Sequence, residues 1–302
     1  MTNYPSVSIV SINYNGAQVT CEMLDSLKKI TYPNFEVIIV DNASKENPDI
    51  IFEKHPWIKF IKSDKNLGFA GGNNLGFKQA TGKYFLMLNN DTEVPEGFLE
   101  PLVRRMESDA TIGAASPKII FHHTPGMLQF AGFEPINPFT VRGNAIGYGR
   151  QDNGEFDTSM PTSRAHGAAM MVSRKVVEEI GLMADLYFLY YEEMDYCERI
   201  KSAGYSIWYE ADSKIFHKES MATGKGSTLK TYYLTRNRIL YQRRNVKGFT
   251  LFVSILFLTF VSIPKNTIQY ILKGKIDMLK AFYKGVIWNL TNYNIHSNES
   301  LI

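Results

Sequence analysis

Cysteine is nearly absent from this chain of 302 residues, which contains only Cys21 and Cys197. The two lie far apart and neither has a partner at a short spacing, so the pattern predicts neither a disulfide framework nor a zinc site. A reducing compartment fits this usage best. The amino terminus also lacks the basic segment and apolar core of a secretory signal. We therefore expect a cytoplasmic protein.

Two features that would define other classes of protein are missing as well. A nucleotide-dependent oxidoreductase would need Gly-x-Gly-x-x-Gly after its first strand, whereas residues 13–16 read Asn-Tyr-Asn-Gly. Long hydrophobic runs are scarce, because only residues 249–263 approach the length of a membrane span. A processive synthase with its own channel needs several such runs and is therefore disfavoured. Disorder is not indicated, since 44% of the residues are hydrophobic and can supply a core.

Acidic residues are rare only in the last quarter of the chain. From Gly226 onward the sequence has 11 basic and 2 acidic residues, against 22 and 28 before it. This asymmetry argues against a uniform nucleic-acid-binding face and predicts a basic appendage on an acidic body. We divide the chain into a main domain, residues 1–225, and a basic, apolar helical extension, residues 226–302. An anionic membrane surface is the expected partner of the extension.

Apolar runs that end in polar residues recur along the first ninety positions. Residues 7–12, 35–40 and 84–88 are runs of the kind that buried parallel strands require, and residues 58–62 form a shorter one. A helical pattern over residues 18–29 separates the first two runs. This alternation predicts right-handed βαβ units, hence an α/β fold with a mostly parallel sheet covered by helices on both faces. Ligands of such sheets bind at the carboxyl ends of the strands.

The run over residues 84–88 is followed by Asn89, Asn90 and Asp91, which we therefore expect at the carboxyl ends of the strands. A carboxylate is the hard oxygen donor that a Mg²⁺-type ion prefers, so Asp91 is a candidate metal ligand. The same residue types also make ordinary turns, and the neighbouring motifs decide between these readings. One neighbour is the glycine-rich stretch over residues 65–76, where we expect a loop that lets backbone approach a ligand closely.

Several motifs together resemble family 2 glycosyltransferases with the GT-A fold, and more narrowly the rhamnosyltransferase-like branch. The first strand ends in Tyr14-Asn15, the second ends in Asp41, and residues 66–74 read Asn-Leu-Gly-Phe-Ala-Gly-Gly-Asn-Asn. The resemblance implies that Asp41 reads the nucleobase of a nucleoside diphosphate sugar, of the dTDP or UDP type. The implied donor-binding residues are Asn13, Tyr14, Asn15, Asp41, Asn66, Gly68, Asn73, Asn89 and Asn90.

The Asp-x-Asp motif of that family, which holds a divalent metal on the donor diphosphate, stands here as Asn89-Asn90-Asp91. The resemblance therefore implies Mg²⁺ or Mn²⁺ on Asp91, with weaker retention because the first carboxylate is missing. It also implies that His217 faces the diphosphate and completes the metal shell. A lone histidine is equally compatible with a structural role.

Three carboxylates follow a run of aromatic residues at positions 188–191, namely Glu192, Glu193 and Asp195. Repulsion and partial desolvation would raise their pKa values toward the range of a general base, although acids also favour the first turn of any helix. The resemblance implies Glu193 as the base, with Glu192 as the alternative. The small residues of segment 165–173 either line the acceptor side of the cleft or pack as a buried strand.

The extension begins with Arg238 in an Arg-Asn-Arg motif, where it could clamp a pyrophosphate or belong to a basic, membrane-facing helix. The apolar run over residues 249–263 stops at Pro264, short of the ~20 residues of a membrane crossing. Its basic flanks predict helices embedded in the inner leaflet. The alternative is a helix packed on the main domain or across a homodimer.

Taken together, these motifs predict an inverting, metal-dependent glycosyltransferase at the inner face of the cell membrane. It would transfer one sugar, with rhamnose preferred, to a hydroxyl of a lipid-linked glycan acceptor in cell-surface polysaccharide biosynthesis. The alternative is a non-catalytic sugar-nucleotide or glycan-binding protein, because a decayed enzyme could also lack the first carboxylate of the metal motif.

Overall fold

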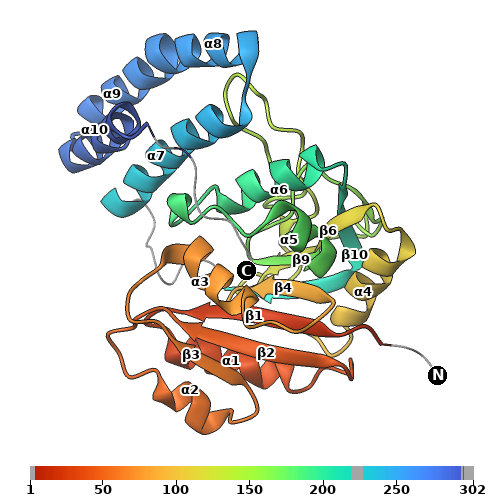
Figure 1. The fold of residues 1–302 in the computed structure, drawn as a ribbon. Helices are drawn as coiled ribbons and strands as arrows, with labels where there is room; N and C mark the ends of the chain where they lie inside the picture. The colour runs from red at the N-terminus through yellow and green to blue at the C-terminus, as the bar shows by residue number, and fades with distance from the viewer. Residues whose placement is uncertain (1–3, 219–226, 294, 296–302) are drawn as a thin grey trace.

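One sheet forms the framework of the computed structural model, which describes residues 4–218, 227–293 and 295 (Figure 1). Its strand order is β3-β2-β1-β4-β9-β6-β10-β5, with β7 beside β6 and β8 beside β10. The strands are β1 (Val7–Asn13), β2 (Phe35–Asp41), β3 (Lys59–Lys62), β4 (Tyr84–Leu88), β5 (Thr92–Glu93), β6 (Ile112–Phe121), β7 (Leu128–Phe130), β8 (Met160–Pro161), β9 (Ala169–Ser173) and β10 (Ser206–His217).

The expected α/β fold with a mostly parallel sheet is confirmed. Strand β1 pairs in parallel with β2 and β4, β2 with β3, and β6 with β10. Strand β9 runs antiparallel between β4 and β6, and Ala169 pairs with Leu88. The small-residue segment before β9 therefore meets the carboxyl end of β4, directly beside Asn89, whose amide donates to the carbonyl of Ala168.

Helices cover both faces of the sheet because alternate residues of its strands are buried on opposite sides. Ile9 of β1 packs in one cluster with the helices α1, α2 and α4, while Val10 packs in another with α3, α5 and α6. The helices of the domain are α1 (Ala17–Leu27), α2 (Asp49–Lys54), α3 (Gly68–Phe77), α4 (Leu99–Ser108), α5 (Arg174–Ile180) and α6 (Glu192–Ser202), with a short 3-10 turn over Asp185–Tyr187.

The expectation of a glycine-rich loop over residues 65–76 is wrong, because helix α3 begins at Gly68. A β-carbon at Gly76 would clash with the side chain of Val10, and one at Gly72 would lie 2.9 Å from Ile12. The glycines thus let α3 pack closely on β1 rather than on a ligand. Gly68 itself has φ +71 and lies against Phe188, a conformation and a space that only glycine fits.

The extension forms a helical lobe on one side of the sheet domain, built from α7 (Thr228–Asn245), α8 (Gly248–Phe257), a π-helical turn (Leu258–Ser262), α9 (Ile263–Leu272) and α10 (Ile276–Thr291) (Figure 1). Helix α10 packs tightly on α7, since a β-carbon at Gly285 would lie 2.9 Å from the carbonyl oxygen of Tyr232. The domain boundary at residues 225 and 226 lies outside the described residues.

The apolar run predicts a helix that ends at Pro264, but in the structure the helix continues through this residue. A proline lacks the N–H of an α-helical bond and crowds the preceding turn, but a π-helical turn lies immediately before it and the chain continues as α9. Residues Gly248–Leu272 therefore make one run of 25 residues, and within the described part of the chain this is the one helix long and apolar enough to cross a membrane. Only 11% of its most apolar window is buried.

Candidate functional site

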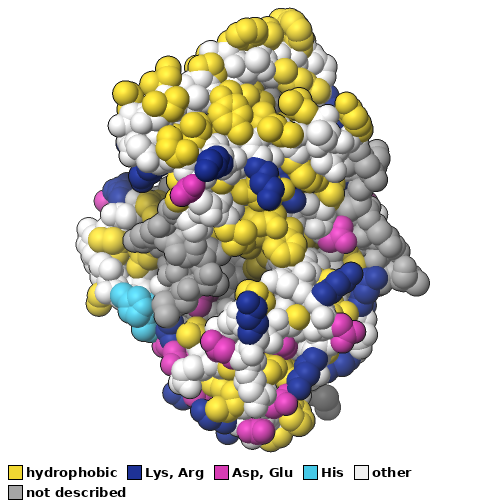
Figure 2. Space-filling view, turned by 90° about the vertical axis from the view of Figure 1, so that its left-hand side faces the viewer, with side chains coloured by type: hydrophobic (Ala, Val, Ile, Leu, Met, Phe, Trp, Pro, Cys, Tyr) yellow, Lys and Arg dark blue, Asp and Glu magenta, His cyan; other side chains and the backbone are white. Residues whose placement is uncertain are grey.

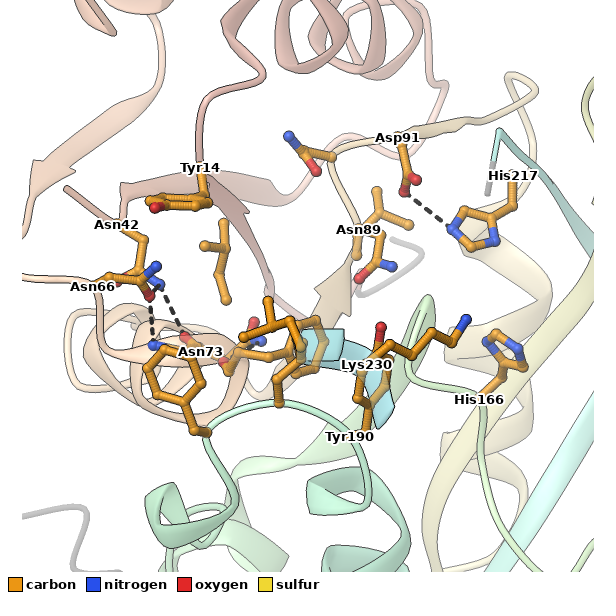
Figure 3. Close-up of a pocket in the computed structure, with 18 of the residues that line it drawn as sticks. Tyr14, Asn42, Asn66, Asn73, Asn89, Asp91, His166, Tyr190, His217 and Lys230 are labelled. Carbon is orange, nitrogen blue, oxygen red and sulfur yellow. Dashed lines mark hydrogen bonds and ion pairs between the residues drawn. The ribbon is translucent and has the colours of Figure 1, made fainter. Parts of the chain in front are cut away.

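A cavity of about 460 Å³ opens at the carboxyl ends of β1 and β4, where the topology predicts a ligand. The sequence-predicted residues that line it are Tyr14, Asn66, Gly68, Asn73, Asn89, Asn90, Asp91 and His217. Figure 3 shows these side chains converging from several elements, with Tyr14 and Asn66 at one end and Asp91 and His217 at the other. The other predicted site residues do not line this cavity, namely Asn13, Asn15, Asp41, Glu192, Glu193 and Arg238.

Asn42 organises the end of the cavity beside Tyr14. Its Nδ2 donates to Asn66 Oδ1 at 3.1 Å and to the carbonyl of Gly68 at 3.0 Å, and its Oδ1 accepts from the amide of Leu67 at 2.8 Å. These bonds fix the start of α3 against the end of β2. The ring of Tyr14 is 38% exposed and is free to stack on a flat ligand such as a nucleobase.

Three predicted donor-binding residues, Asn13, Asn15 and Asp41, do not line the cavity. The carboxylate of Asp41 accepts hydrogen bonds from Asn13 at 2.7 Å and from the hydroxyl and amide of Ser44 at 2.6 and 3.1 Å. Asn15 bonds to the following loop through its Oδ1, which accepts from the amide of Lys45 at 2.7 Å. In this conformation Asn13, Asn15 and Asp41 therefore brace two strand ends, and only Asn42 of that loop reaches the cavity.

The opposite end of the cavity carries the candidate metal ligands. His217 Nε2 lies 3.0 Å from Asp91 Oδ1, and His217 Nδ1 lies 2.7 Å from Gln129 Oε1. Because an amide oxygen only accepts, Nδ1 donates to Gln129. Nε2 faces a carboxylate, which also only accepts, so either a proton on Nε2 or a cation has to lie between the two atoms.

The residues therefore fit a divalent cation. Two neighbouring ligands of an octahedral ion, each bound at about 2.1 Å, lie about 3 Å apart, as Nε2 and Oδ1 do here. Asp91 and His217 would supply one carboxylate and one imidazole, and diphosphate and water oxygens the remaining positions. Among the described residues no group of three or more histidine, cysteine or acidic side chains forms a metal cage, so the ligand itself has to complete the shell.

His166 is a neutral hydrogen-bond donor in the wall of this cavity. Burial lowers its pKa to about 3, and His217 and Arg164 add to the shift. Its Nδ1 accepts from the amide of Ala168 at 3.0 Å, so the proton resides on Nε2. The ring stacks on Phe133 at a centroid distance of 6.0 Å, which holds its orientation.

Glu192 and Glu193 occupy the first turn of α6, immediately after the cavity-lining Tyr190, and neither lines the cavity itself. Burial raises the pKa of Glu192 well above its ordinary value, and the neighbouring Glu193 raises it further. Burial also raises the pKa of Glu193, which lies against Gly167, where a β-carbon would be 3.6 Å from its Cγ. Both carboxylates thus have the raised pKa that a general base requires.

The loop before these acids is held by helix α7. Phe188, Tyr190 and Tyr191 all have positive φ, which is uncommon for bulky residues and requires support from the surrounding structure. Asn237 supplies it, because its Nδ2 donates to the carbonyls of Tyr187, Leu189 and Tyr190 at 2.9, 2.7 and 2.7 Å. The adjacent Arg236 donates to the carbonyls of Leu186 and Tyr187 at 2.7 and 2.5 Å.

Arg238 does not reach the diphosphate end of this cavity, where the sequence analysis placed it as a candidate. Its guanidinium donates to the carbonyl of Thr140 at 2.7 and 3.0 Å and to Ser262 Oγ at 3.1 Å. It lines a second cavity on the other side of Tyr191. The cation that does line the first cavity is Lys230, on the first turn of α7.

Fold and cavity together define a class, namely an α/β protein that presents its ligand site at the carboxyl ends of parallel strands. Residues 8–181 match the model of the glycosyl transferase family 2. The match covers more than half of the chain, and the protein therefore belongs to glycosyltransferase family 2.

The chain is similar to proteins of known or assigned activity from an archaeon and a bacterium. It is 26% identical over 253 residues to the low-salt glycan biosynthesis hexosyltransferase Agl10 of Haloferax volcanii, covering 79% of this chain and 76% of that protein. It is 21% identical over 238 residues to the N-acetylglucosaminyl-diphospho-decaprenol L-rhamnosyltransferase of Mycobacterium tuberculosis, covering 72% and 77%. The mannosyltransferase PcManGT of Pyrobaculum calidifontis, solved with GDP-Man and Mn²⁺, superposes with a TM-score of 0.59 at 16% identity, over 97% of this chain and 89% of that one. This likeness shows the GT-A fold.

Five polar residues that line the cavity were not predicted as site residues: Asn42, Gln129, His166, Tyr190 and Lys230. Asn42 had a signal, since it follows directly on Asp41 at a strand end, and His166 lies in the segment over residues 165–173, which was a candidate wall of the cleft. Gln129 had none, because its role depends on β7 bringing it to the end of β10 in space.

Proposed function

We propose that the protein is an inverting glycosyltransferase that transfers one sugar from a nucleoside diphosphate donor to a hydroxyl of a glycan acceptor. The observation that carries the proposal is the convergence of Asp91 and His217 at one end of a cavity whose other end is bounded by Tyr14, Asn42 and Asn66. Membership of family 2 supports the reaction class.

The chain's own residues divide the work along the cavity. Tyr14 stacks on the nucleobase with Asn42 beside it, while Asp41 supports this end of the cavity through its bonds to Asn13 and Ser44. Asn89 contacts the ribose. Asp91 and His217 would hold Mg²⁺ or Mn²⁺, and such an ion, when bound, would supply positive charge for the diphosphate leaving group. Lys230 adds a second positive charge at the diphosphate, and His166 donates a neutral hydrogen bond to it or to the sugar.

Glu193 is the proposed general base. It takes the proton of the acceptor hydroxyl as that oxygen attacks the anomeric carbon, in a single displacement. Its raised pKa, caused by burial, makes it a stronger proton acceptor than an exposed glutamate. Glu192 is the alternative base. It is only 3% exposed, and its Oε2 has no hydrogen-bond partner among the described residues.

The donor and acceptor are proposed from the relatives. The similarity to a rhamnosyltransferase supports rhamnose, carried by dTDP, as the transferred sugar, while the hexosyltransferase at 26% identity supports a hexose carried by UDP or a related nucleotide. Both names describe glycan synthesis, and one of them a diphospho-decaprenol acceptor. We accordingly propose a lipid-linked glycan as the acceptor, in cell-surface polysaccharide synthesis.

The helical lobe supports a location at the inner surface of the cell membrane. Its large apolar side chains are exposed, among them Phe249 at 78%, Phe260 at 71% and Leu272 at 81%. Ser262 Oγ in the same run accepts a hydrogen bond from the guanidinium of Arg238 of α7 at 3.1 Å, and Ser254 donates to the carbonyl of Phe139 at 2.8 Å. One side of the run is therefore tied to the protein, which favours a helix lying in the leaflet over one that spans it.

The decisive test measures thermal shift with dTDP- and UDP-sugars, with and without Mn²⁺. We expect a nucleotide sugar to stabilise the protein, Mn²⁺ to increase that shift, and Asp91→Ala to abolish the increase. Glu93→Ala is the matched control, because Glu93 is a nearby acid that pairs with Lys218 and does not line the cavity. An unchanged metal effect in Asp91→Ala would remove the central assignment.

The absence of a carboxylate at Asn89 supports a second candidate, a sugar-nucleotide-binding protein without transferase activity. Donor hydrolysis or transfer separates the two. A protein that binds the donor with Mn²⁺ but never releases nucleoside diphosphate, in the presence of lipid extract as a source of acceptor, would be the binding protein.

A further inference from the structure

A second cavity, of about 420 Å³, lies between α7 and the helices that follow it. Three cationic side chains line it, Arg142 from the loop before β8, and Lys230 and Arg238 from α7. Among its described lining residues there is no aspartate or glutamate. A cavity with three positive charges and no acid in its wall is a binding site for an anion.

Arg238 is built into this wall. Three of its hydrogen bonds go to Thr140 and Ser262, so the guanidinium has a fixed plane and keeps further N–H groups for a ligand. Burial lowers the pKa of Arg238, and the nearby Arg142 cation adds to the shift. Arg142 is exposed, and its carbonyl accepts from the amide of Asn137, but its guanidinium makes no hydrogen bond or ion pair with the described residues. An anion between the two arginines would supply the missing counter-charge.

Apolar side chains form much of the rest of the wall, among them Leu234, Leu258, Phe282 and Val286, beside the polar Thr231, Thr235, Ser262 and Asn266. Figure 2 shows apolar side chains gathered over the part of the molecule that α8, α9 and α10 form, with lysine and arginine side chains below them. The exposed apolar residues of this surface are Phe249, Phe252, Ile255, Leu256, Phe260, Val261, Ile268, Ile271, Leu272, Ile276, Ile287 and Leu290. An anionic group that enters here is therefore best carried by a molecule with an apolar chain.

The second cavity adjoins the first. Lys230 lines both, and Figure 3 shows it beside Tyr190 in the first cavity. Tyr190 lines the first cavity and Tyr191 the second, and the candidate base Glu193 follows two residues later. A sugar attached to an anion in the second cavity would thus start close to the acids of α6.

We propose that the second cavity binds the phosphate or diphosphate group through which a lipid-linked acceptor carries its glycan. Arg142 and Arg238 hold the phosphate oxygens, and the lipid chain runs along the apolar surface of α8 and α9. This assignment rests on the proposed glycosyltransferase function, since it names the part of the acceptor that this enzyme would recognise.

The test measures binding of the full-length protein to neutral phosphatidylcholine vesicles that contain either undecaprenyl diphosphate or phosphatidylglycerol, at equal surface charge. We expect tighter binding to undecaprenyl diphosphate, and a loss of about tenfold in Arg142→Ala, the effect of one charge-assisted hydrogen bond. Binding to phosphatidylglycerol should change little in that variant. Lys273→Ala is the matched control, because Lys273 lies in the same lobe outside the cavity. It should weaken binding to both vesicles equally.

Three results would overturn the proposal: equal binding of the wild type to both vesicles, an equal loss for both in Arg142→Ala, or an Arg142-dependent thermal shift as large with inorganic diphosphate as with the lipid. The last result would mean a site for a free anion. Thermal shift with nucleotide sugar and Mn²⁺ is measured on the same samples. If donor binding persists while the lipid preference is absent, only the acceptor site fails; if donor binding is absent, the proposed function fails.

Discussion

At the scale of single residues, Gln129 sets the protonation pattern of His217. Its Oε1 accepts from Nδ1 at 2.7 Å, which leaves Nε2 as the atom that faces Asp91. Partners of this kind fix the tautomer and orientation of metal-binding histidines, and their loss typically costs 10- to 100-fold in metal affinity. Gln129 is only 5% exposed, so its side chain contacts the protein rather than solvent.

We therefore expect Gln129→Met to weaken Mn²⁺ binding by roughly 10- to 100-fold in the presence of nucleoside diphosphate, as measured by calorimetry. Gln129→Glu keeps an acceptor oxygen for Nδ1 and should retain the affinity. Equal affinities in the two variants would show that the hydrogen bond to His217 does not matter for the metal.

Glu193 gives a prediction for the pH dependence of turnover. Burial raises its pKa, so the carboxyl stays protonated at pH values where an exposed glutamate is already ionised. Only the ionised form can act as a base, and kcat should therefore rise with pH through this raised pKa. Glu193→Gln should lower kcat by roughly 10²-fold or more and remove the rise, with donor affinity nearly unchanged. Retained turnover in Glu193→Gln, with its loss in Glu192→Gln, would instead assign the base to Glu192.

At the scale of elements, helix α7 completes the site although it lies outside residues 8–181, which match the family. Asn237 donates to three carbonyls of the loop that leads into α6, and that loop contains three bulky residues with positive φ. Without these bonds the loop would relax toward ordinary backbone angles and turn α6 and its acids away.

Asn237→Leu should accordingly lower stability by about 2 kcal/mol or more, because it leaves buried carbonyls unpaired, and should also lower kcat. Gln242→Leu is the matched control. Gln242 is a buried amide of α7 that donates to Ser254 Oγ of α8, away from the loop. Its loss should cost similar stability with little change in kcat. A kcat that falls equally in both variants would point to general destabilisation rather than to positioning of the loop.

The elements also show where sequence reasoning succeeds. The strand that ends in Asp41 and the strand that leads to Asp91 were predictable, because a buried parallel strand leaves a continuous apolar run with an abrupt polar end. Helix α3 was not, since glycine disfavours helices and the close packing of Gly76 on Val10 that compensates is a tertiary contact. The helix through Pro264 depends on a π-helical turn that no local pattern announces. His217 and Asp91, in turn, meet across 126 positions of sequence.

At the scale of the whole molecule, the exposed apolar surface of α8 and α9 predicts how the protein distributes between water and membrane. Burying this surface in a membrane should contribute several kcal/mol to the free energy of membrane binding, at ~25 cal/mol per Å² of apolar surface. The lysines nearby add up to about 1 kcal/mol each at an anionic surface, and only this part is screened by salt.

The full chain should therefore sediment with anionic vesicles and be released only partly by high salt. Phe252→Glu combined with Phe260→Glu should keep it in the supernatant. The matched control is Phe52→Glu, because Phe52 is an exposed phenylalanine of α2, 45% accessible and far from the lobe in the fold. Complete release of the wild type by salt would mean a purely electrostatic contact, and no sedimentation at all would favour a dimer interface. A chain truncated after Lys247 is a less suitable test of membrane binding than these substitutions, because the truncation also removes α10, which packs tightly on α7.

The support that α7 gives to the loop before α6 also sets the order in which the protein can become active during its synthesis. The ribosome delivers the chain from its amino terminus, so Tyr14, Asn42 and Asn66 at one end of the first cavity emerge first. Phe188, which lies against Gly68, and His217 come much later, and Asn237, which holds the loop, later still. A nascent chain therefore carries part of the cavity wall long before the loop that leads to α6 can be held in place, and activity begins only when the helical lobe is itself being made.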